Sequence, residues 1–179
     1  GVVVDNITID GTQIDLSSGD LTLDVAGDIY LDADGAEVFI ADGGTSIGKL
    51  ANDGATNFTV ASIVSDKDIL FQGNDGGTGI TALTLDMSAA GAATFNNDVT
   101  AFSDERLKTD IETINDELNK VCQMRGVTFK RTDDDGRTSV GVIAQEIEKI
   151  IPEVVREDNS EDKIKSVAYG NIVGVLIEA

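Results

Sequence analysis

Apolar residues in the first forty positions occur in pairs two residues apart, and these pairs repeat along the chain. The pairs are Ile7 with Ile9, Ile14 with Leu16, Leu21 with Leu23, Ile29 with Leu31, and Val38 with Ile40. Successive pairs start seven to nine residues apart, and segments rich in Gly and Asp separate them. Alternation of period two between Gly and Asp is typical of short strands joined by tight turns. The repeat therefore predicts a β-solenoid, a meander or a sandwich.

The composition changes abruptly at Phe102. Residues 1–102 carry 16 acids, all Asp except Glu37, against only two bases, Lys49 and Lys67, so this part has a net charge of −14. Residues 103–179 carry 17 acids and 11 bases, a net charge of −6, and are rich in Glu, Lys and Arg. A shift of this size indicates a domain boundary. We therefore expect one domain over 1–102 and a second over 103–179.

The first domain offers little for a single chain to bury. Its apolar residues are small, aromatic residues are few, and each pair exposes only a narrow apolar stripe. Three copies wound around a common axis would bury these stripes and cover the free strand edges. We therefore interpret 1–102 as a mainly β fibre trunk of repetitive short strands, trimeric and triple-β-helix-like. A monomeric β-sandwich is the alternative.

The second domain follows a different period. Apolar residues at 107, 111, 114, 118 and 121 have helical spacing and predict a helix from soon after Ser103 to Gly126. Strands are predicted at 127–131 and 139–144 around an Asp-Gly turn, then a helix that Pro152 stops. Two further strands, at 153–158 and 163–169, precede a last helix, which we expect to continue past Ala179. The pattern predicts a small α+β domain.

Charge and composition exclude several functions. The net charge of −20 argues against nucleic acid and anionic membranes as partners, since a phosphate-binding surface needs bases. No segment approaches the ~20 apolar residues of a membrane span, and no export signal begins the sequence. With no His, a Ser-His-Asp triad is excluded, so a general base must be Lys, an acid or water. The acids at 32, 34 and 37 do not follow calcium-loop spacing. We expect no metal and no cofactor.

Three motifs in the second domain resemble one known family. They are "SDERLK" at 103–108, "GVIAQEIEKIIPEVV" at 141–155 and "IKSVAYGNIVGVLIEA" at 164–179. In order and spacing they resemble the C-terminal intramolecular chaperone domain of phage tail spikes, tail fibres and endosialidases, the peptidase S74 family. The resemblance implies a homotrimer whose C-terminal domain helps the upstream fibre trunk to fold and then cuts itself off. It also implies a virion tail fibre or spike, assembled in the host cytoplasm, with a host surface receptor or glycan as a further partner.

The same resemblance implies that Ser103 and Lys108 form the catalytic dyad of a self-cleaving serine peptidase. A serine hydroxyl needs a base to take its proton, and a desolvated lysine can supply one. The implied cut lies between Ser103 and Asp104. Cleavage between Phe102 and Ser103 is the alternative, because a hydroxyl attacks the preceding carbonyl more easily than its own.

Four further residues, Glu105, Arg106, Gln145 and Glu146, are candidates for a supporting role. Arg106 would orient Asp104 or Glu105, or stabilise an oxyanion. Gln145 and Glu146 would line the site or a subunit interface, although exposed polar positions on an amphipathic helix are the commoner explanation. Elsewhere, Phe129 and Tyr169 are expected in the core, and Cys122 is expected to be a buried thiol.

A purely structural interpretation of the first motif remains open. Ser103 would then be a helix N-cap, with Asp104 and Glu105 at the positive end of the helix dipole. The chain would be a structural adhesin or receptor-binding fibre tip with a permanent trimerising cap. A bacterial surface adhesin would call for an export signal. The family's eukaryotic branch, membrane-tethered transcription factors, would call for a basic trunk, whereas 1–102 has a net charge of −14.

Overall fold

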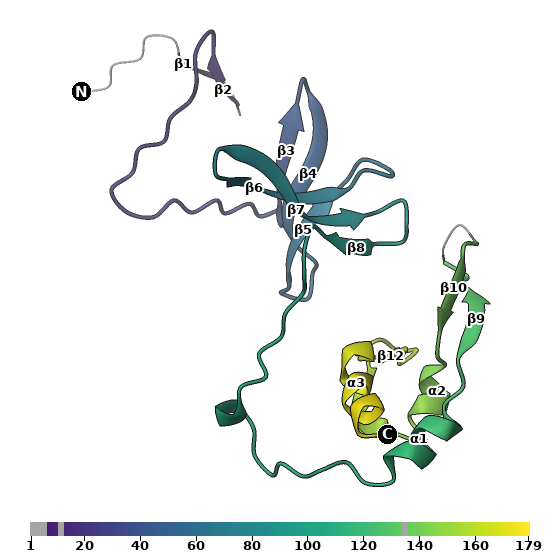
Figure 1. The fold of residues 1–179 in the computed structure, drawn as a ribbon. Coiled ribbons are helices and arrows are strands. Elements are labelled where there is room, and N and C mark those ends of the chain that lie inside the picture. The colour runs from purple at the N-terminus through teal and green to yellow at the C-terminus, as the bar shows by residue number, and fades with distance from the viewer. Residues whose placement is uncertain (1–6, 11–12, 134–135) are drawn as a thin grey trace. The chain divides into compact units, whose positions relative to one another are not determined.

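The computed structural model describes residues 7–10, 13–133 and 136–179, and its secondary structure is mainly β (Figure 1). The chain divides into two compact units, 1–61 and 62–179.

The first unit contains a hairpin and a three-stranded sheet. Strand β1 (Ile7–Asp10) pairs antiparallel with β2 (Gln13–Leu16). Strands β3 (Glu37–Asp42), β4 (Thr45–Asn52) and β5 (Phe58–Ser62) form a sheet in that order, and a register shift interrupts β3 after Ile40. The pairs at 7–9, 14–16 and 38–40 therefore lie in strands, as the repeat predicted.

The strands predicted at 21–23 and 29–31 are wrong for this chain. Residues 17–36 form turns, bends and irregular backbone without a strand. The side chains of Leu21, Leu23, Ile29 and Leu31 are 50 to 67% exposed. A strand needs a neighbour for its backbone hydrogen bonds, and none of the described strands pairs with this segment. The apolar repeat is present, but a single chain does not bury it.

The second unit begins with another three-stranded sheet. Strands β6 (Ile69–Asp75), β7 (Thr78–Asp86) and β8 (Ala92–Phe95) pair antiparallel in sequence order. Gly76 and Gly77 join β6 to β7 with φ angles of 58° and 95°. Two consecutive positive φ angles make a turn whose twist matches that of a hairpin, and Gly adopts them without strain.

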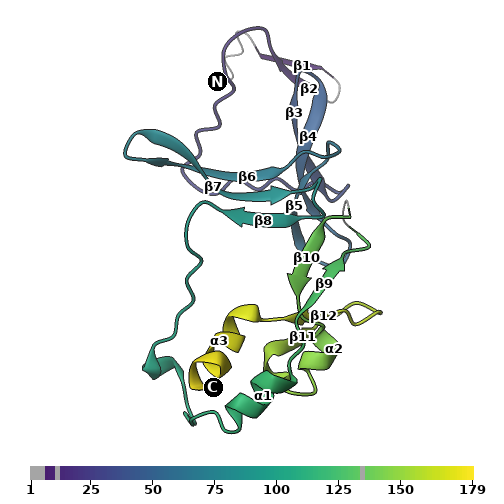
Figure 2. The ribbon, with the colours of Figure 1, turned by 45° about the vertical axis from the view of Figure 1, so that its right-hand side comes forward.

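The remainder of the second unit is the small α+β part that the sequence predicted (Figure 2). Its helices are η1 (Glu105–Leu107), α1 (Glu117–Gln123), α2 (Ala144–Ile147), η2 (Pro152–Val154) and α3 (Tyr169–Glu178). Its strands form two antiparallel hairpins, β9 (Val127–Lys130) with β10 (Thr138–Gly141), and β11 (Val155–Glu157) with β12 (Lys165–Val167). The helix predicted up to Pro152 is shorter than expected: α2 ends at Ile147, turns follow at 148–150, and Pro152 opens η2 instead of stopping α2.

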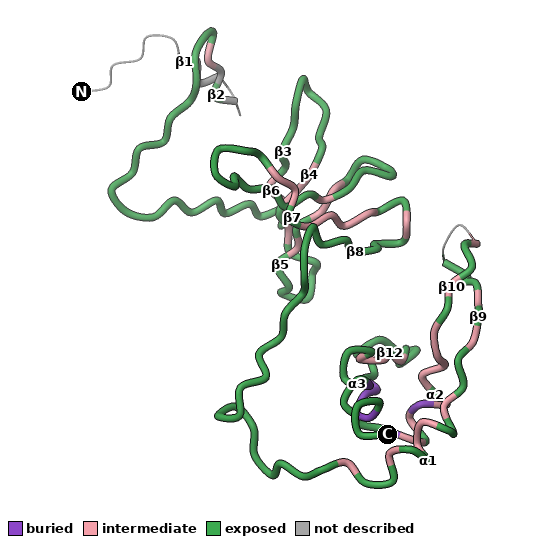
Figure 3. The backbone as a smooth tube through the Cα atoms, in the orientation of Figure 1, coloured by how far each residue is buried: buried purple, intermediate pink, exposed green. Residues whose placement is uncertain are grey.

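The hydrophobic core lies in this α+β part. Among the residues whose burial is described, the buried ones all lie within 147–175 (Figure 3). They are Ile147, Ile151, Val154, Val155, Ile172 and Val175. Of these, Ile147 alone has no exposed surface. The described residues of 1–102 include no buried side chain. The hydrophobic core of the described residues therefore lies outside the proposed trunk.

The single helix predicted from Ser103 to Gly126 is wrong. Only η1 and α1 are helical there, and residues 108–116 connect them without a helix. Asp110 and Asp116 have φ angles of 52° and 57°, in the left-handed region that an α-helix cannot include. This segment is rich in Thr, Ile and Asp, which favour helices weakly, so the apolar spacing alone did not suffice.

Two expectations about burial are also corrected. Cys122 is exposed on α1 rather than buried. Tyr169 is 53% exposed, so only part of its ring is covered, while Phe129 is half-buried. The Tyr169 hydroxyl accepts a hydrogen bond of 3.2 Å from the amide of Val142, which ties the start of α3 to the end of β10.

Gly141 allows that contact because it has no side chain. A Cβ atom at this position would lie 2.5 Å from the Tyr169 hydroxyl oxygen and 3.2 Å from a ring carbon of Phe129. We expect Gly141→Ala to force Tyr169 outward and to lower the free energy of unfolding by about 1–3 kcal/mol, the usual cost of overpacking. Urea unfolding would measure this change in the free energy of unfolding. Gly170→Ala is the control, because a Cβ there meets no atom within 4 Å; equal stability of both variants would contradict the prediction.

Candidate functional site

The side chains of Ser103 and Lys108 are in direct contact. The Lys108 Nζ atom donates a hydrogen bond of 2.7 Å to the Ser103 Oγ atom. The two residues flank the short helix η1 and lie where the composition of the sequence changes. Both are exposed. The structure thus brings together the two residues that the first motif predicted as a pair.

The turn between them is built from local hydrogen bonds. The amides of Leu107 and Lys108 donate to the carbonyls of Asp104 and Glu105, at 3.1 and 3.0 Å. Asp104, and not Ser103, is the N-cap, because its Oδ1 atom accepts a 2.9 Å hydrogen bond from the Arg106 amide. The expectation that Ser103 caps a helix is therefore corrected. The Ser103 hydroxyl instead accepts from Lys108.

Arg106 folds back onto Asp104 in a bidentate ion pair. Its Nε atom lies 2.9 Å from Asp104 Oδ1, and its Nη2 atom lies 2.7 Å from Oδ2. These hydrogen bonds hold the pKa of Asp104 below its usual value and raise the pKa of Arg106, with the side-chain contact as the main cause in both. Of the two roles predicted for Arg106, the geometry fits the orientation of Asp104.

The Ser–Lys contact has the distance that proton transfer requires. A protonated Lys108 amine donates to the serine, whereas a neutral amine at the same position would accept the hydroxyl proton and activate the oxygen. Burial would favour the neutral amine, yet the neighbouring Phe102 and Leu107 are 97% and 70% exposed. They line an open hollow of about 370 Å³ together with Asp104 and Arg106. One chain aligns the pair but does not desolvate it.

The remaining candidates make other contacts. Glu146 forms a bidentate ion pair with Arg125, which includes a 3.1 Å hydrogen bond from Arg125 Nε. Gln145 is exposed on α2. Glu105 supplies its carbonyl to the turn. The hydrogen bonds of the described residues do not connect Glu146 to the Ser–Lys pair, and its role at the site stays a prediction.

Glu146 offers a pH test of the fold. The hydrogen bonds from Arg125 hold the pKa of Glu146 below its usual value. A carboxyl with a lowered pKa stabilises the fold above the pKa of the unfolded chain, and loses this effect as the pH falls through the lowered value. We expect Glu146→Gln to lower Tm slightly at pH 7 and to have no effect once the pH has fallen below the lowered pKa of Glu146. A difference in Tm that persists at low pH would contradict this explanation.

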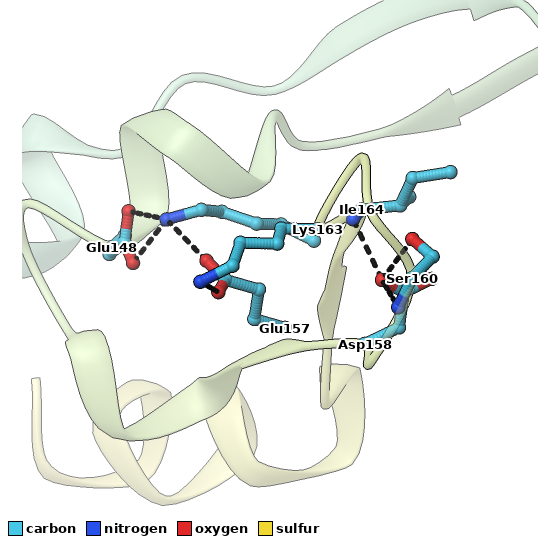
Figure 4. Close-up of polar contacts among 7 residues, drawn as sticks. Glu148, Glu157, Asp158, Ser160, Lys163 and Ile164 are labelled. Carbon is cyan, nitrogen blue, oxygen red and sulfur yellow. Dashed lines mark hydrogen bonds and ion pairs between the residues drawn. The ribbon is translucent and has the colours of Figure 1, made fainter.

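A second ionic cluster, which the sequence analysis missed, fastens α2 to the β11–β12 hairpin (Figure 4). Lys165 Nζ donates to both carboxylate oxygens of Glu148 at 2.6 Å. The same Nζ atom lies 3.8 Å from a carboxylate oxygen of Glu157, and Lys163 Nζ lies 3.3 Å from the other oxygen of Glu157. The contact with Glu148 raises the pKa of Lys165. Glu148 and Lys165 are 17 residues apart, so no helical or strand periodicity pointed to the pair. The cluster has no nucleophile and supports the fold.

The described part of the chain contains no group of three or more His, Cys, Asp or Glu side chains arranged to hold a metal ion. In the same residues, no helix is both long and apolar enough to span a lipid bilayer.

Residues 103–156 match the model of a protein family described as the chaperone of endosialidase, peptidase S74. This segment begins at the serine of the Ser–Lys pair and ends in β11. The predicted resemblance is confirmed for residues 103–156, which match this family's model. The third motif, at 164–179, lies beyond the matched residues.

Curated relatives agree with this assignment. The chain is 34% identical over 83 residues to a long tail fiber protein, Gp37, of Enterobacteria phage K3, and 30% identical over 93 residues to that of Salmonella phage S16. The matches cover 43% and 48% of this chain. They cover only 7% and 12% of the relatives, so the chain corresponds to a small part of their length. The chain is thus similar to phage long tail fibre proteins, and within it residues 103–156 match the model of the endosialidase chaperone family.

Proposed function

We propose that this chain is part of a phage tail fibre whose C-terminal domain, 103–179, promotes trimerisation and folding of the β-trunk, 1–102, and then cuts the chain at Ser103. The contact of Lys108 Nζ with Ser103 Oγ, at 2.7 Å, carries the proposal. The family match and the composition boundary at the same serine support it. Each chain is cut once, in a single hydrolysis.

Ser103 is the nucleophile and Lys108 the general base. At the Phe102–Ser103 bond, the hydroxyl would attack the Phe102 carbonyl, the amide nitrogen would leave as an amine, and water would hydrolyse the ester formed. At the Ser103–Asp104 bond, attack by Ser103 on its own carbonyl would need a strained four-membered ring. A water molecule activated at the same place, or the serine of another copy, fits that bond better. Either route consumes one water and leaves a carboxylate and an amine.

The trunk explains why such a domain is useful. Its described apolar side chains are largely exposed in one chain, which fits burial against other copies. A near-repeating sequence can slip by one repeat and still bury most of the same surface. A trimerising C-terminal domain would raise the effective concentration of the trunk ends and start winding in register. Cutting afterwards would remove the domain that promotes winding, so an unwound trunk could not easily rewind. The persistence of the fibre would then depend on how slowly the trunk unwinds, which is kinetic stability.

The exposure of the Ser–Lys pair suggests how cutting waits for assembly. Lys108 acts as a base only when its amine is neutral, and burial favours that form. Neighbouring copies in a trimer would cover the pair and the apolar side chains of Phe102 and Leu107. The partners are therefore two further copies and the upstream trunk. The place of action is the virion tail fibre or spike after assembly in the host cytoplasm, and a host surface receptor or glycan is a further partner of the fibre.

Dependence on concentration tests this proposal. The full chain is synthesised in a cell-free system at several concentrations, and cut chains are quantified on denaturing gels. We expect the cut fraction at a fixed time to rise with concentration, and Ser103→Ala to stay whole throughout. A cutting rate that is independent of concentration down to the monomer would refute assembly control, and an uncut wild-type chain would refute self-cleavage.

The second candidate is a structural adhesin or receptor-binding fibre tip with a permanent trimerising cap. The Asp104 cap and its ion pair with Arg106 favour it, because they give the first motif a structural role without any reaction. In that case wild type and Ser103→Ala would both remain whole and would form the same oligomer.

A further inference from the structure

We infer that Asp104 and Arg106 act together as positioning residues, which hold the η1 turn so that Lys108 meets Ser103. This inference rests on the proposed function for its catalytic consequence. Its structural content, that the ion pair controls the Ser–Lys contact, can be tested even in a chain that is not cut.

The turn has little else to hold it. None of its residues is buried, so the hydrophobic core contributes nothing to its conformation. A three-residue 3-10 helix is not stable by itself in water. Its two backbone hydrogen bonds, of 3.1 and 3.0 Å, are supplemented by three from Arg106 to the Asp104 carboxylate. The Asp104–Arg106 pair therefore supplies most of the polar contacts within the turn.

The turn also determines whether the reacting side chains meet. The backbone is extended at Asp104, with φ −61° and ψ 137°, and again at Lys108, with φ −125° and ψ 146°. Without the turn between them, extended residues five positions apart would lie up to about 17 Å from each other. With the turn, Lys108 Nζ lies 2.7 Å from Ser103 Oγ. Loosening of the turn is thus expected to lower the fraction of chains in which the pair touches.

The chain contains a matched control for this ion pair. Arg131 binds Asp133 through the same atoms, with Nε 2.8 Å from Oδ1 and Nη2 2.5 Å from Oδ2. These residues are also two positions apart and exposed, and they follow β9. Arg131→Ala removes an equivalent surface ion pair elsewhere in the chain.

The first arm of the test measures the first-order rate of chain cutting in freshly synthesised full-length protein. Asp104→Ala and Arg106→Ala are each expected to slow cutting about tenfold. Because both substitutions break the same ion pair, the double variant should cut no more slowly than the slower of the two single variants. Asp104→Asn keeps an oxygen for the Arg106 amide and is expected to slow cutting only about threefold. Across pH, the maximal rate should fall while the midpoint of the profile stays in place. Arg131→Ala should cut at the wild-type rate.

Arg106→Ala is the decisive variant, because Arg106 does not border either candidate bond. If Asp104→Ala slows cutting while Arg106→Ala does not, the effect belongs to the side chain beside the cut and the inference is wrong. A shifted midpoint of the pH profile would also overturn it, since this would indicate an electrostatic effect on the base.

The second arm applies if the wild-type chain remains whole. Lys108 is labelled with acetic anhydride and its rate of acetylation is followed by peptide mass spectrometry. Ser103→Ala, Asp104→Ala and Arg106→Ala are expected to raise this rate about threefold over wild type and Arg131→Ala, because a hydrogen-bonded amine reacts more slowly. That result would support the positioning role, whereas the whole wild-type chain would by itself refute self-cleavage. Unchanged labelling in Asp104→Ala and Arg106→Ala would overturn the inference.

Discussion

Lys108→Arg is expected to leave the chain uncut although it retains the positive charge. Arg still donates hydrogen bonds to Ser103, but its guanidinium does not lose a proton in proteins and cannot accept one from the hydroxyl. General-base catalysis contributes about 100- to 10,000-fold, so cutting within hours would become cutting within weeks or longer. A role that needs only a cation would survive this substitution.

Denaturing gels of wild type and Lys108→Arg over time provide the measurement. Lys120→Arg is the matched control, because Lys120 Nζ also donates a 2.7 Å hydrogen bond to a residue five positions away, the carbonyl of Asn115. We expect the control to cut at the wild-type rate. Cutting of Lys108→Arg at a similar rate would exclude Lys108 as the base.

Ile147→Ala is expected to have the largest effect on stability. Ile147 has no exposed surface and lies in the centre of the core that α2, η2, β11 and α3 share. Removing a buried isoleucine side chain beyond its Cβ leaves a cavity and costs about 2–5 kcal/mol. A small domain has only about 5–15 kcal/mol of stability in total, so much of it would be lost.

Urea unfolding in the uncut Ser103→Ala background measures this loss, at one fixed protein concentration because assembly contributes to apparent stability. Val140→Ala is the control, since Val140 is 80% exposed and should change stability by no more than about 0.5 kcal/mol. A loss below 1 kcal/mol for Ile147→Ala would contradict the core described above.

The hairpins of the second domain were predictable because their signals are local. An Asp-Gly turn between apolar strands predicted β9 and β10, and polar residues between two further apolar segments predicted β11 and β12. The single helix predicted after Ser103 was wrong. The prediction used the apolar spacing alone and did not weigh the poor helix propensity of Thr109, Asp110 and Asp116. The missing strands at 21–23 and 29–31 have a different cause. Strand formation depends on a neighbouring strand, which a single chain does not supply there.

Within the site, the Ser103–Lys108 pair was expected from the motif, and the structure brings the two side chains together. The cap was assigned to the wrong residue. Ser and Asp are equally good N-caps, so the sequence did not distinguish Ser103 from Asp104. The bidentate arrangement of Arg106 on Asp104 depends on side-chain rotamers, which a spacing of two residues does not determine. The same holds for Arg125 and Glu146, which are 21 residues apart.

The intact mass of freshly expressed full-length protein under denaturing conditions tests the central claim most directly. The account predicts two fragments whose masses sum to that of the whole chain plus one water, with the new end on one side of Ser103. Their masses would also identify the bond as Phe102–Ser103 or Ser103–Asp104. A single species with the mass of the whole chain, identical to that of Ser103→Ala, would contradict self-cleavage.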